Sequence, residues 1–294
     1  MKDITQLQTD MRMLSVRIMD SENKHCGSGL LYIHDEKNVF VLTAAHVLGE
    51  FGEGQKFFVK CHPDPSPGND ESEEEDKYIF SISRTEDNVQ PAYIPGAFPK
   101  HKYNVQDAAV IRLDISGKED WILKRKRAKF APENKNLERA KVAGSGYPEI
   151  KGSNPSTHMA SKEIEPTKAI CEKHNLDTAH GDSKHEVEWS LGIEVSDPNS
   201  TGETGGWSGC ILALVEANEI TLAGIALAIY PQYEFKLFRG ADMYFIRKLL
   251  EGKWVEKVNE ADPNPNGGNL TEMPQIHHQE MYQSAFGYPA HSHS

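Results

Sequence analysis

Three polar residues stand at the edges of apolar segments and follow one another along the chain as His46, Asp107 and Ser208. The histidine ends the segment FVLTAAH, the aspartate precedes AAVIRL, and the serine lies in the turn TGGWSG before CILALV. A serine hydroxyl becomes an effective nucleophile when a base removes its proton, and imidazole is well matched to that task near neutral pH. A buried carboxylate holds the imidazole in the required tautomer. The residues therefore predict nucleophilic catalysis, with Ser208 as nucleophile, His46 as general base and Asp107 as the group that orients the base.

The glycines around the serine indicate the same chemistry. They permit a backbone turn in which the N–H groups of Gly206 and Ser208 point into one cavity, where a tetrahedral oxyanion would form. Loss of one such donor costs about 3 kcal/mol of transition-state stabilisation. We therefore expect these two N–H groups to supply an oxyanion hole.

The segments that must position these residues are short and apolar or alternating, and turn residues separate them. This pattern predicts strands, and it favours an all-β structure in which antiparallel strands form a barrel or a sandwich. Helical periodicity is clear only at 241–250, before Gly252, where it predicts a helix that packs on the strands. The predicted strands are 14–19, 29–34, 39–42, 55–60, 78–83, 108–113, 141–144, 187–195, 210–215 and 221–229.

Polar segments separate or follow the predicted strands. Residues 63–76 are acidic and predict a loop, and residues 151–184 predict an ordered insertion or a mobile flap. The basic run 124–129 predicts a solvated segment. Residues 258–294 cannot bury enough apolar surface to offset the entropy lost on ordering, so we expect a disordered tail.

The composition excludes some classes of partner. The chain has 294 residues with 44 acidic and 32 basic side chains, and its net charge of −12 disfavours direct nucleic-acid or anionic-membrane binding. No apolar segment reaches the roughly 20 residues that span a bilayer. The first residues carry acidic groups where a signal peptide has basic and apolar ones, and the four cysteines lack close pairing. We therefore expect a cytoplasmic protein with reduced thiols.

The motifs TAAH, QDAAVIRL and GGWSG resemble the histidine, aspartate and serine motifs of the trypsin-like (chymotrypsin-fold) serine peptidases, in that family's order. The segments CGSGL, GSGYP and LAGI resemble the same family, so the resemblance covers about residues 10–250. The turn TGGWSG is closer to the bacterial glutamyl-endopeptidase and HtrA-like branches than to the digestive trypsins. A compact protease with a tail and no signal peptide also resembles the protease effectors of bacterial stress or defence systems.

The resemblance implies two six-stranded antiparallel β-barrels with a C-terminal helix. The peptidase domain would span residues 1–257, with barrel halves at about 10–120 and 121–257. The implied protein is an intracellular serine endopeptidase that hydrolyses peptide bonds of protein or peptide substrates, without cofactor or metal. The sequence leaves one alternative open, a catalytically inactive module of the same fold that binds peptides or partner proteins.

Some residues depart from the family pattern. Trp207 stands where zymogen-activated members carry an aspartate that pairs with a newly cut N-terminal ammonium, and an indole cannot form that ion pair. We therefore expect the segment 151–184, or a regulatory protein partner, to control the site instead. Val47 replaces a cysteine of secreted relatives, which agrees with a reducing compartment, and Cys210 replaces a second glycine after the serine.

The resemblance also implies a pocket for the side chain before the cleaved bond. Its base is Gly202, which carries no charge, and its walls are apolar, so the expected preference is for medium apolar residues such as Leu, Met or Phe. Glu203 is the one feature that would change this preference, by binding a basic side chain. The predicted substrate-binding residues are Gly202, Glu203, Thr204, Ala226, Leu227 and Ala228.

Cysteine and histidine residues elsewhere in the chain are candidates for other sites. Cys210 could act as a nucleophile, but its apolar neighbours predict a buried, inert thiol. The pair Cys61-His62 could bind zinc with Cys171 and His174, but the paired spacing typical of zinc sites is missing. The remaining candidate metal ligands lie in the polar tail and are expected to be solvated; they are His277, His278, His291 and His293.

Overall fold

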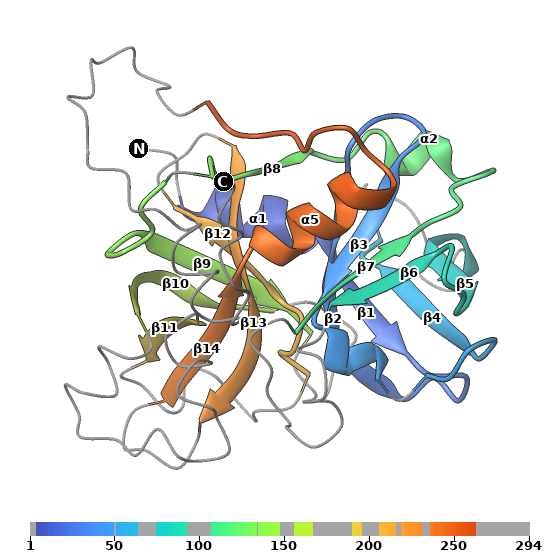
Figure 1. Cartoon of the computed structure of the whole chain (residues 1–294), viewed down its shortest axis with the longest axis horizontal. Coiled ribbons are helices and arrows are strands. Elements are labelled where there is room, and N and C mark those ends of the chain that lie inside the picture. The colour runs from blue at the N-terminus through green and yellow to red at the C-terminus, as the bar shows by residue number, and fades with distance from the viewer. Residues whose placement is uncertain are drawn as a thin grey trace, which may run out of the picture.

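The computed structural model describes residues 4–49, 51–63, 75–92, 107–133, 135–147, 156–166, 190–195, 206–215, 219–230 and 236–262. These residues form a mostly β structure in which two seven-stranded sheets lie side by side, accompanied by a few helices (Figure 1). The prediction of an antiparallel β structure is confirmed at this level. Neighbouring strands of both sheets pair antiparallel except for one parallel pair in the second sheet.

The first sheet is antiparallel throughout and has the strand order β5-β4-β1-β2-β3-β7-β6. β3, near its middle, is buried along its whole length, which explains its continuous apolar sequence VFVLT. β5, at one edge, alternates between buried and less buried residues. The strands are β1 (Ser15–Met19), β2 (His25–Ile33), β3 (Val39–Thr43), β4 (Lys56–Cys61), β5 (Ile79–Ser83), β6 (Val89–Ala92) and β7 (Ala108–Arg112).

The second sheet has the order β12-β9-β10-β11-β14-β13-β8, and β12 also pairs with β13. The pairings of six strands therefore return to the strand from which they start, while β8 joins β13 in parallel. The strands are β8 (Ala128–Phe130), β9 (Lys141–Gly146), β10 (Ser156–Pro166), β11 (Ser190–Val195), β12 (Ile211–Leu214), β13 (Ile220–Tyr230) and β14 (Lys236–Asp242).

The two longer helices each pack against the sheet that lies far from them in sequence. Helix α1 (Ile4–Leu14) precedes the first sheet but contacts β9, β10 and β13, as well as β2. Helix α5 (Tyr244–Lys253) follows the second sheet but contacts β6 and β7 (Figure 1). The helix near each end of the described chain therefore packs on the sheet that is formed by the other half of the chain. The shorter helical segments are α2 (Glu119–Ile122), η1 (Ala45–Leu48) and η2 (Glu75–Tyr78).

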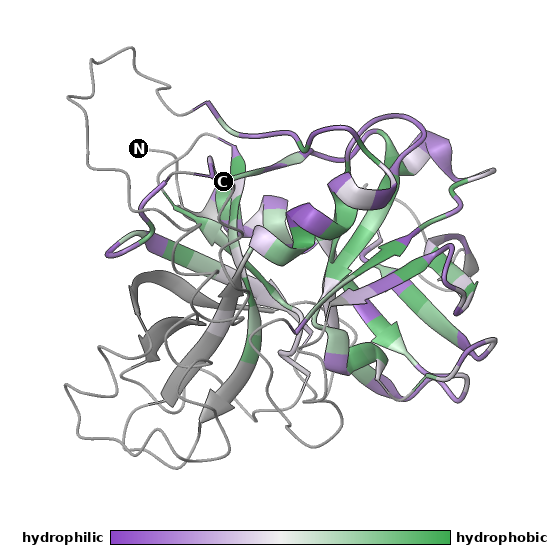
Figure 2. Cartoon of the chain, in the orientation of Figure 1, coloured by the Kyte–Doolittle hydropathy of each residue, from purple (hydrophilic) through white to green (hydrophobic). Residues whose placement is uncertain are grey.

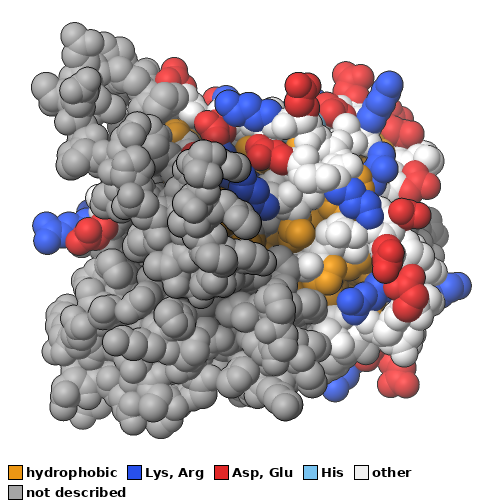
Figure 3. All heavy atoms as spheres, in the orientation of Figure 1, with side chains coloured by type: hydrophobic (Ala, Val, Ile, Leu, Met, Phe, Trp, Pro, Cys, Tyr) orange, Lys and Arg blue, Asp and Glu red, His pale blue; other side chains and the backbone are white. Residues whose placement is uncertain are grey.

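One cluster of buried apolar side chains extends through both sheets and both longer helices. Tyr32 and Phe130 connect the sheets within it, with ring centroids 5.1 Å apart and a T-shaped arrangement. A second, smaller cluster lies against β12, whose residues alternate between the two clusters. Apolar residues concentrate in the strands and polar residues in the loops (Figure 2), and the described part of the face in Figure 3 mixes acidic and basic side chains.

Several segments differ from the sequence prediction. The helix expected at 241–250 begins at Tyr244, because β14 continues to Asp242. Within the segment 151–184, predicted as an insertion or flap, residues Ser156–Pro166 form β10, which pairs with β9 and β11 and so belongs to the sheet. The rest of that segment and the acidic residues 64–74 lie outside the described residues.

The prediction of a disordered tail from residue 258 is wrong for residues 258–262. The Asn259 N–H donates to the Tyr32 hydroxyl at 3.2 Å, and its side-chain amide donates to the His34 carbonyl at 3.0 Å. Glu260 pairs with Arg247 of α5. Residues up to 262 are therefore part of the packed structure, while 263–294 lie outside the described residues. None of the helices in the described part of the chain is both long enough and apolar enough to cross a membrane.

Candidate active site

The pairing of β3 with β7 places His46 next to Asp107. In that antiparallel pair Thr43, the last residue of β3, lies opposite Ala109, near the start of β7. His46 follows β3 in the short helix η1, and Asp107 directly precedes β7. Residues after one strand and before its antiparallel neighbour lie at the same edge of the sheet, so the register alone brings the two side chains together.

Both carboxylate oxygens of Asp107 accept hydrogen bonds from His46. Oδ1 accepts from the backbone N–H at 2.7 Å, and Oδ2 accepts from Nδ1 of the ring. The Asp107 side chain is 2% exposed, whereas the imidazole is 28% exposed. Because a carboxylate only accepts, Nδ1 carries the ring proton, and Nε2 of the neutral ring keeps a lone pair. The arrangement leaves Nε2, in a side chain that is partly exposed, able to take a proton.

Ser208 lies in a tight turn that precedes β12. Gly206 and Gly209 have φ angles of 82° and 84°, a conformation that favours glycine. The Gly209 N–H donates to the Ala226 carbonyl at 2.8 Å, and the Ser208 carbonyl accepts from the Ser28 N–H at 2.8 Å. The turn is therefore held between β13 of the second sheet and β2 of the first.

The turn also lies against the segment that leads to His46. A Cβ atom added to Gly209 would collide with the Ser28 carbonyl oxygen and Thr43 Oγ1, and would lie 3.1 Å from the Ala44 nitrogen. Gly27 permits a second close approach, between the Ser208 turn and η1. A Cβ added to Gly27 would lie 2.6 Å from a Val47 methyl and 3.1 Å from the Ser208 carbonyl oxygen. Ser208 therefore neighbours the η1 turn that carries His46.

The Ser208 hydroxyl donates to the Leu227 carbonyl at 3.3 Å. Within the described residues, no hydrogen bond joins Ser208 to His46. The N–H groups of Gly206 and Ser208 likewise have no acceptor in the described part of the chain. Among the described residues, these two backbone donors therefore make no hydrogen bond within the protein, which is a condition for an oxyanion hole.

Trp207 anchors this turn by burial. Its side chain is 1% exposed and belongs to the smaller apolar cluster, with Cys210, Leu212 and Ala226 among its members. An ammonium group that reached this position would meet an apolar environment rather than a carboxylate. The environment of Trp207 is therefore the opposite of the one that an N-terminal ion pair needs.

A buried serine that the sequence analysis passed over also contacts the turn. Ser28, in the CGSGL segment of β2, is completely buried and its hydroxyl donates to the Gly206 carbonyl at 2.6 Å. The same hydroxyl accepts from the Tyr147 N–H at 2.8 Å. Its only sequence signal is the position of a small polar residue between two glycines, and that pattern does not reveal a partner 178 residues away.

Two of the cysteines in the described part of the chain, Cys61 and Cys210, are buried. Cys210 is fully buried, and burial raises the pKa of its thiol, so the prediction of an inert thiol is confirmed. Burial also raises the pKa of Cys61 to about 12, which disfavours the thiolate that zinc requires. Cys171 and His174 lie outside the described residues, and no group of three metal-ligating side chains occurs among those that are described.

The predicted specificity residues divide into two groups. Ala226 and Leu227 are each 1% exposed and pack in the two core clusters, and it is the carbonyl of Leu227 that reaches Ser208. Ala228 lies in β13 opposite Arg239 of β14. Gly202, Glu203 and Thr204 lie outside the described residues, as do the tail histidines His277, His278, His291 and His293.

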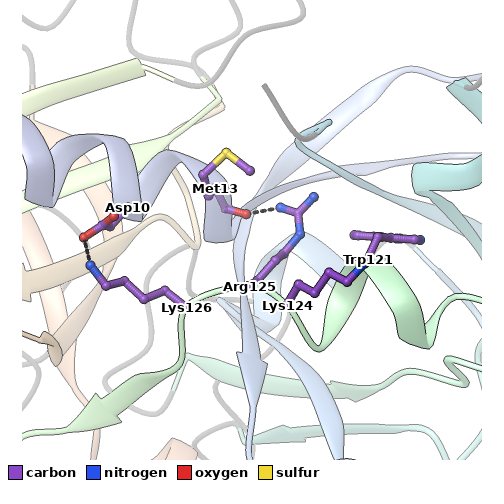
Figure 4. Close-up of a pocket in the computed structure, with 6 residues that line it drawn as sticks. All are labelled: Asp10, Met13, Trp121, Lys124, Arg125 and Lys126. Carbon is purple, nitrogen blue, oxygen red and sulfur yellow. Dashed lines mark hydrogen bonds and ion pairs between the residues drawn. The ribbon is translucent and has the colours of Figure 1, made fainter. Parts of the chain in front are cut away.

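A cavity of about 180 Å³ lies elsewhere, beside α1 and the segment after α2 (Figure 4). Arg125 is 8% exposed and donates to the carbonyls of Met13 and His62, while Lys126 pairs with Asp10 of α1. The prediction that the whole basic run 124–129 is solvated is therefore wrong for Arg125 and for Ala128, which is 0% exposed in β8. Arg125 and Lys126 therefore hold α1 to the segment of chain that connects the two sheets. The cavity is lined by Asp10, Met13, Trp121, Lys124, Arg125 and Lys126.

Comparison with known proteins adds no relative. The chain matches no model of a known protein family, and no curated protein matches its sequence.

Proposed function

We propose that this protein is a serine endopeptidase in which Ser208 is the nucleophile, His46 the general base and Asp107 the residue that orients it. The observation that carries the proposal is the pair of hydrogen bonds from His46 to a buried Asp107, which directs Nδ1 to the carboxylate and leaves Nε2 of the neutral ring able to accept a proton. The Ser208 turn, packed against β2 and the end of β3, supports it.

The reaction would follow from these positions. Ser208 Oγ bonds to the carbonyl carbon of the peptide while its proton passes to His46 Nε2, and the carbonyl electron pair moves to oxygen. The N–H groups of Gly206 and Ser208 stabilise that oxyanion. The C–N bond then breaks as the imidazolium gives its proton to the leaving amine, and water repeats both steps to release the acid.

We infer further that the two sheets are the two barrels of a chymotrypsin-like fold, with α5 as its C-terminal helix. The closed ring of pairings in the second sheet and the curled antiparallel first sheet support this inference. So does the division of the site, because His46 and Asp107 come from the first sheet and Ser208 comes from the turn before β12.

The proposed substrates are extended peptides with a medium apolar residue before the cleaved bond. The position of the Leu227 carbonyl beside Ser208 supports an extended peptide, and the uncharged Gly202 supports an apolar side chain. The side chains of Ala226 and Leu227, predicted as pocket walls, are each 1% exposed and pack in the core instead. The proposed setting is the cytoplasm. Control would come from a regulatory protein, because Trp207 is packed in apolar surroundings and Ser156–Pro166, within the predicted flap, belongs to the second sheet.

Labelling with a fluorophosphonate tests the proposal directly, since this probe reacts with serines that a base activates. We expect folded wild-type protein to be labelled at Ser208, and both Ser208→Ala and His46→Ala to lose labelling and peptide hydrolysis. Ser116→Ala removes an exposed serine elsewhere and serves as the matched control, with labelling unchanged. A folded wild-type protein that stays unlabelled would contradict the proposal.

One observation favours a second candidate, a module that binds peptides without cleaving them. The Ser208 hydroxyl donates to Leu227 rather than to His46. Rotation about the Cα–Cβ bond of Ser208 would break only this one hydrogen bond, so the observation is also compatible with catalysis. Peptide binding by wild-type protein without labelling or turnover would support the second candidate.

A further inference from the structure

A buried hydroxyl group from the first sheet holds the turn that carries the proposed oxyanion hole. Ser28 Oγ lies 2.6 Å from the Gly206 carbonyl oxygen, to which it donates, and 2.8 Å from the Tyr147 nitrogen, from which it accepts. The Ser28 side chain is 0% exposed, so no solvent competes for these bonds. The Tyr147 carbonyl is a second acceptor, at 3.4 Å, and the much shorter distance to the Gly206 carbonyl favours that oxygen for the single hydroxyl proton.

Gly206 needs such an external constraint. A glycine has no Cβ and adopts many backbone conformations at similar energy, and Gly206 has a φ of 82°. Its N–H and its carbonyl belong to adjacent peptide groups joined through the φ and ψ of this one residue, so holding the carbonyl restricts the directions that the N–H can take. The backbone of Trp207, the next residue, is fixed by its buried indole. Ser28 thus supplies the missing restraint on the carbonyl side of Gly206.

Ser28 is itself held by a chain of hydrogen bonds. Arg17 Nε donates to His25 Nδ1 at 3.3 Å, so the other ring nitrogen, Nε2, carries the proton and donates to the Tyr147 carbonyl at 2.9 Å. Tyr147 follows β9, and its N–H donates to Ser28. Thr43 donates to the Ser28 carbonyl at 2.7 Å, from the strand that leads to His46. The Ser28 hydroxyl is therefore placed by groups from both sheets.

We propose that Ser28 is a positioning residue for the reaction: its hydroxyl fixes the Gly206 peptide so that the Gly206 N–H points at the developing oxyanion. This inference rests on the proposed peptidase function. Ser28 does not touch the substrate in this mechanism. It acts through Gly206, and its contribution appears in the transition state, where the oxyanion exists, rather than in substrate binding.

The test compares Ser28→Ala with Ser15→Ala in the full-length protein. Ser15 is a matched control, because its buried hydroxyl donates to the Met11 carbonyl at 3.0 Å and shares a 2.7 Å hydrogen bond with Ser145. Hydrolysis of a fluorogenic peptide gives kcat and KM. The affinity of a peptide aldehyde ending in leucinal reports the oxyanion hole separately, since its adduct with Ser208 carries the tetrahedral oxygen.

We expect Ser28→Ala to lower kcat by about 10- to 100-fold, to change KM by less than about threefold, and to weaken the aldehyde in proportion to kcat. Ser15→Ala should leave all three within about threefold of wild type. Ser28→Cys keeps a side chain of similar size and a weak donor, and its kcat should lie between Ser28→Ala and wild type. If Ser28→Ala does not fold, the comparison of Ser28→Cys with wild type tests the proposal.

The outcomes separate the inference from the function on which it rests. Active wild-type protein, with Ser28→Ala or Ser28→Cys matching Ser15→Ala in kcat and aldehyde affinity, overturns the role of Ser28 alone. A fall in kcat that leaves aldehyde affinity unchanged also overturns it, because the hole would then be intact. Wild-type protein that neither hydrolyses peptides nor reacts with fluorophosphonate overturns the proposed function and this inference together.

Discussion

At the scale of single residues, the geometry of the candidate site depends on two hydrogen bonds of Asp107 and on the lack of a side chain at Gly209. Asp107 uses one oxygen for the His46 backbone and the other for its ring, so the carboxylate sets both the position and the tautomer of the base. On the other side, Gly209 lies where any side chain would collide with Ser28 and Thr43. The Ser208 turn can therefore lie close to β2 and the end of β3 only because residue 209 has no Cβ atom.

The glycine can be tested by its effect on stability. Gly209→Ala should destabilise the protein by more than about 3 kcal/mol, since both a φ of 84° and two collisions oppose the new methyl group. Gly54→Ala is the matched control, with a φ of 76° and open space around the added Cβ, and should cost about 1 kcal/mol. Urea unfolding measures both. Equal losses would show that crowding at Gly209 contributes nothing.

At the scale of elements, the long-range packing of α1 and α5 joins the two sheets. Each helix neighbours one sheet in sequence and contacts the other in space. Asp10 and Met13 of α1 also hold Lys126 and Arg125 of the segment between the sheets. We infer that α1 stabilises the relative placement of the sheets on which the division of the candidate site depends.

This role of α1 predicts a distinct mutational pattern. Met11→Ala should lower the free energy of unfolding by about 2–5 kcal/mol, because the side chain is 0% exposed and belongs to the main core. Gln6→Ala, on the exposed side of the helix, loses one side-chain hydrogen bond and should cost less than about 0.5 kcal/mol. Thermal and urea unfolding measure the free-energy loss of each variant. A loss for Met11→Ala as small as that for Gln6→Ala would contradict the stabilising role of α1.

At the scale of the whole molecule, the fold buries two tyrosine hydroxyl groups and two cysteine thiols that can lose a proton at high pH. Burial raises the pKa of Tyr32 and of Cys61 to about 12, from ordinary values of 10.0 and 9.0. Burial likewise raises the pKa of Tyr147 and Cys210 above these ordinary values. Each group therefore holds its proton more tightly in the folded protein than in the unfolded chain. The stability that they contribute is complete below pH 9 and is lost as the pH rises toward the folded values.

We accordingly expect the free energy of unfolding to fall above about pH 9, by up to about 1.4 kcal/mol per pH unit for each group that is ionised only in the unfolded chain. Urea unfolding at pH values between about 8 and 10.5 measures this slope. Tyr147→Phe removes one of the groups and should make the slope shallower than in wild type. A stability that does not change over this range would contradict the prediction.

The sequence by itself determined the strands whose own residues specify them. The apolar run of β3 and the segments of β7 and β13 were predicted within a residue or two, because burial on a sheet requires β-branched and apolar side chains wherever the partner strand comes from. It also brought His46, Asp107 and Ser208 forward as candidates, since each stands at the end of such a strand or in a glycine turn.

Tertiary structure decided the features that depend on partners distant in sequence. Helix α1 has only a few buried apolar residues among polar ones, and β8 has three residues, so neither carries a strong pattern of its own. The position of Asn259 depends on Tyr32, and the role proposed for Ser28 depends on Gly206, 178 residues further along. A hydrogen bond between such residues leaves no local periodicity, because its geometry comes from strand register and sheet packing rather than from neighbouring residues.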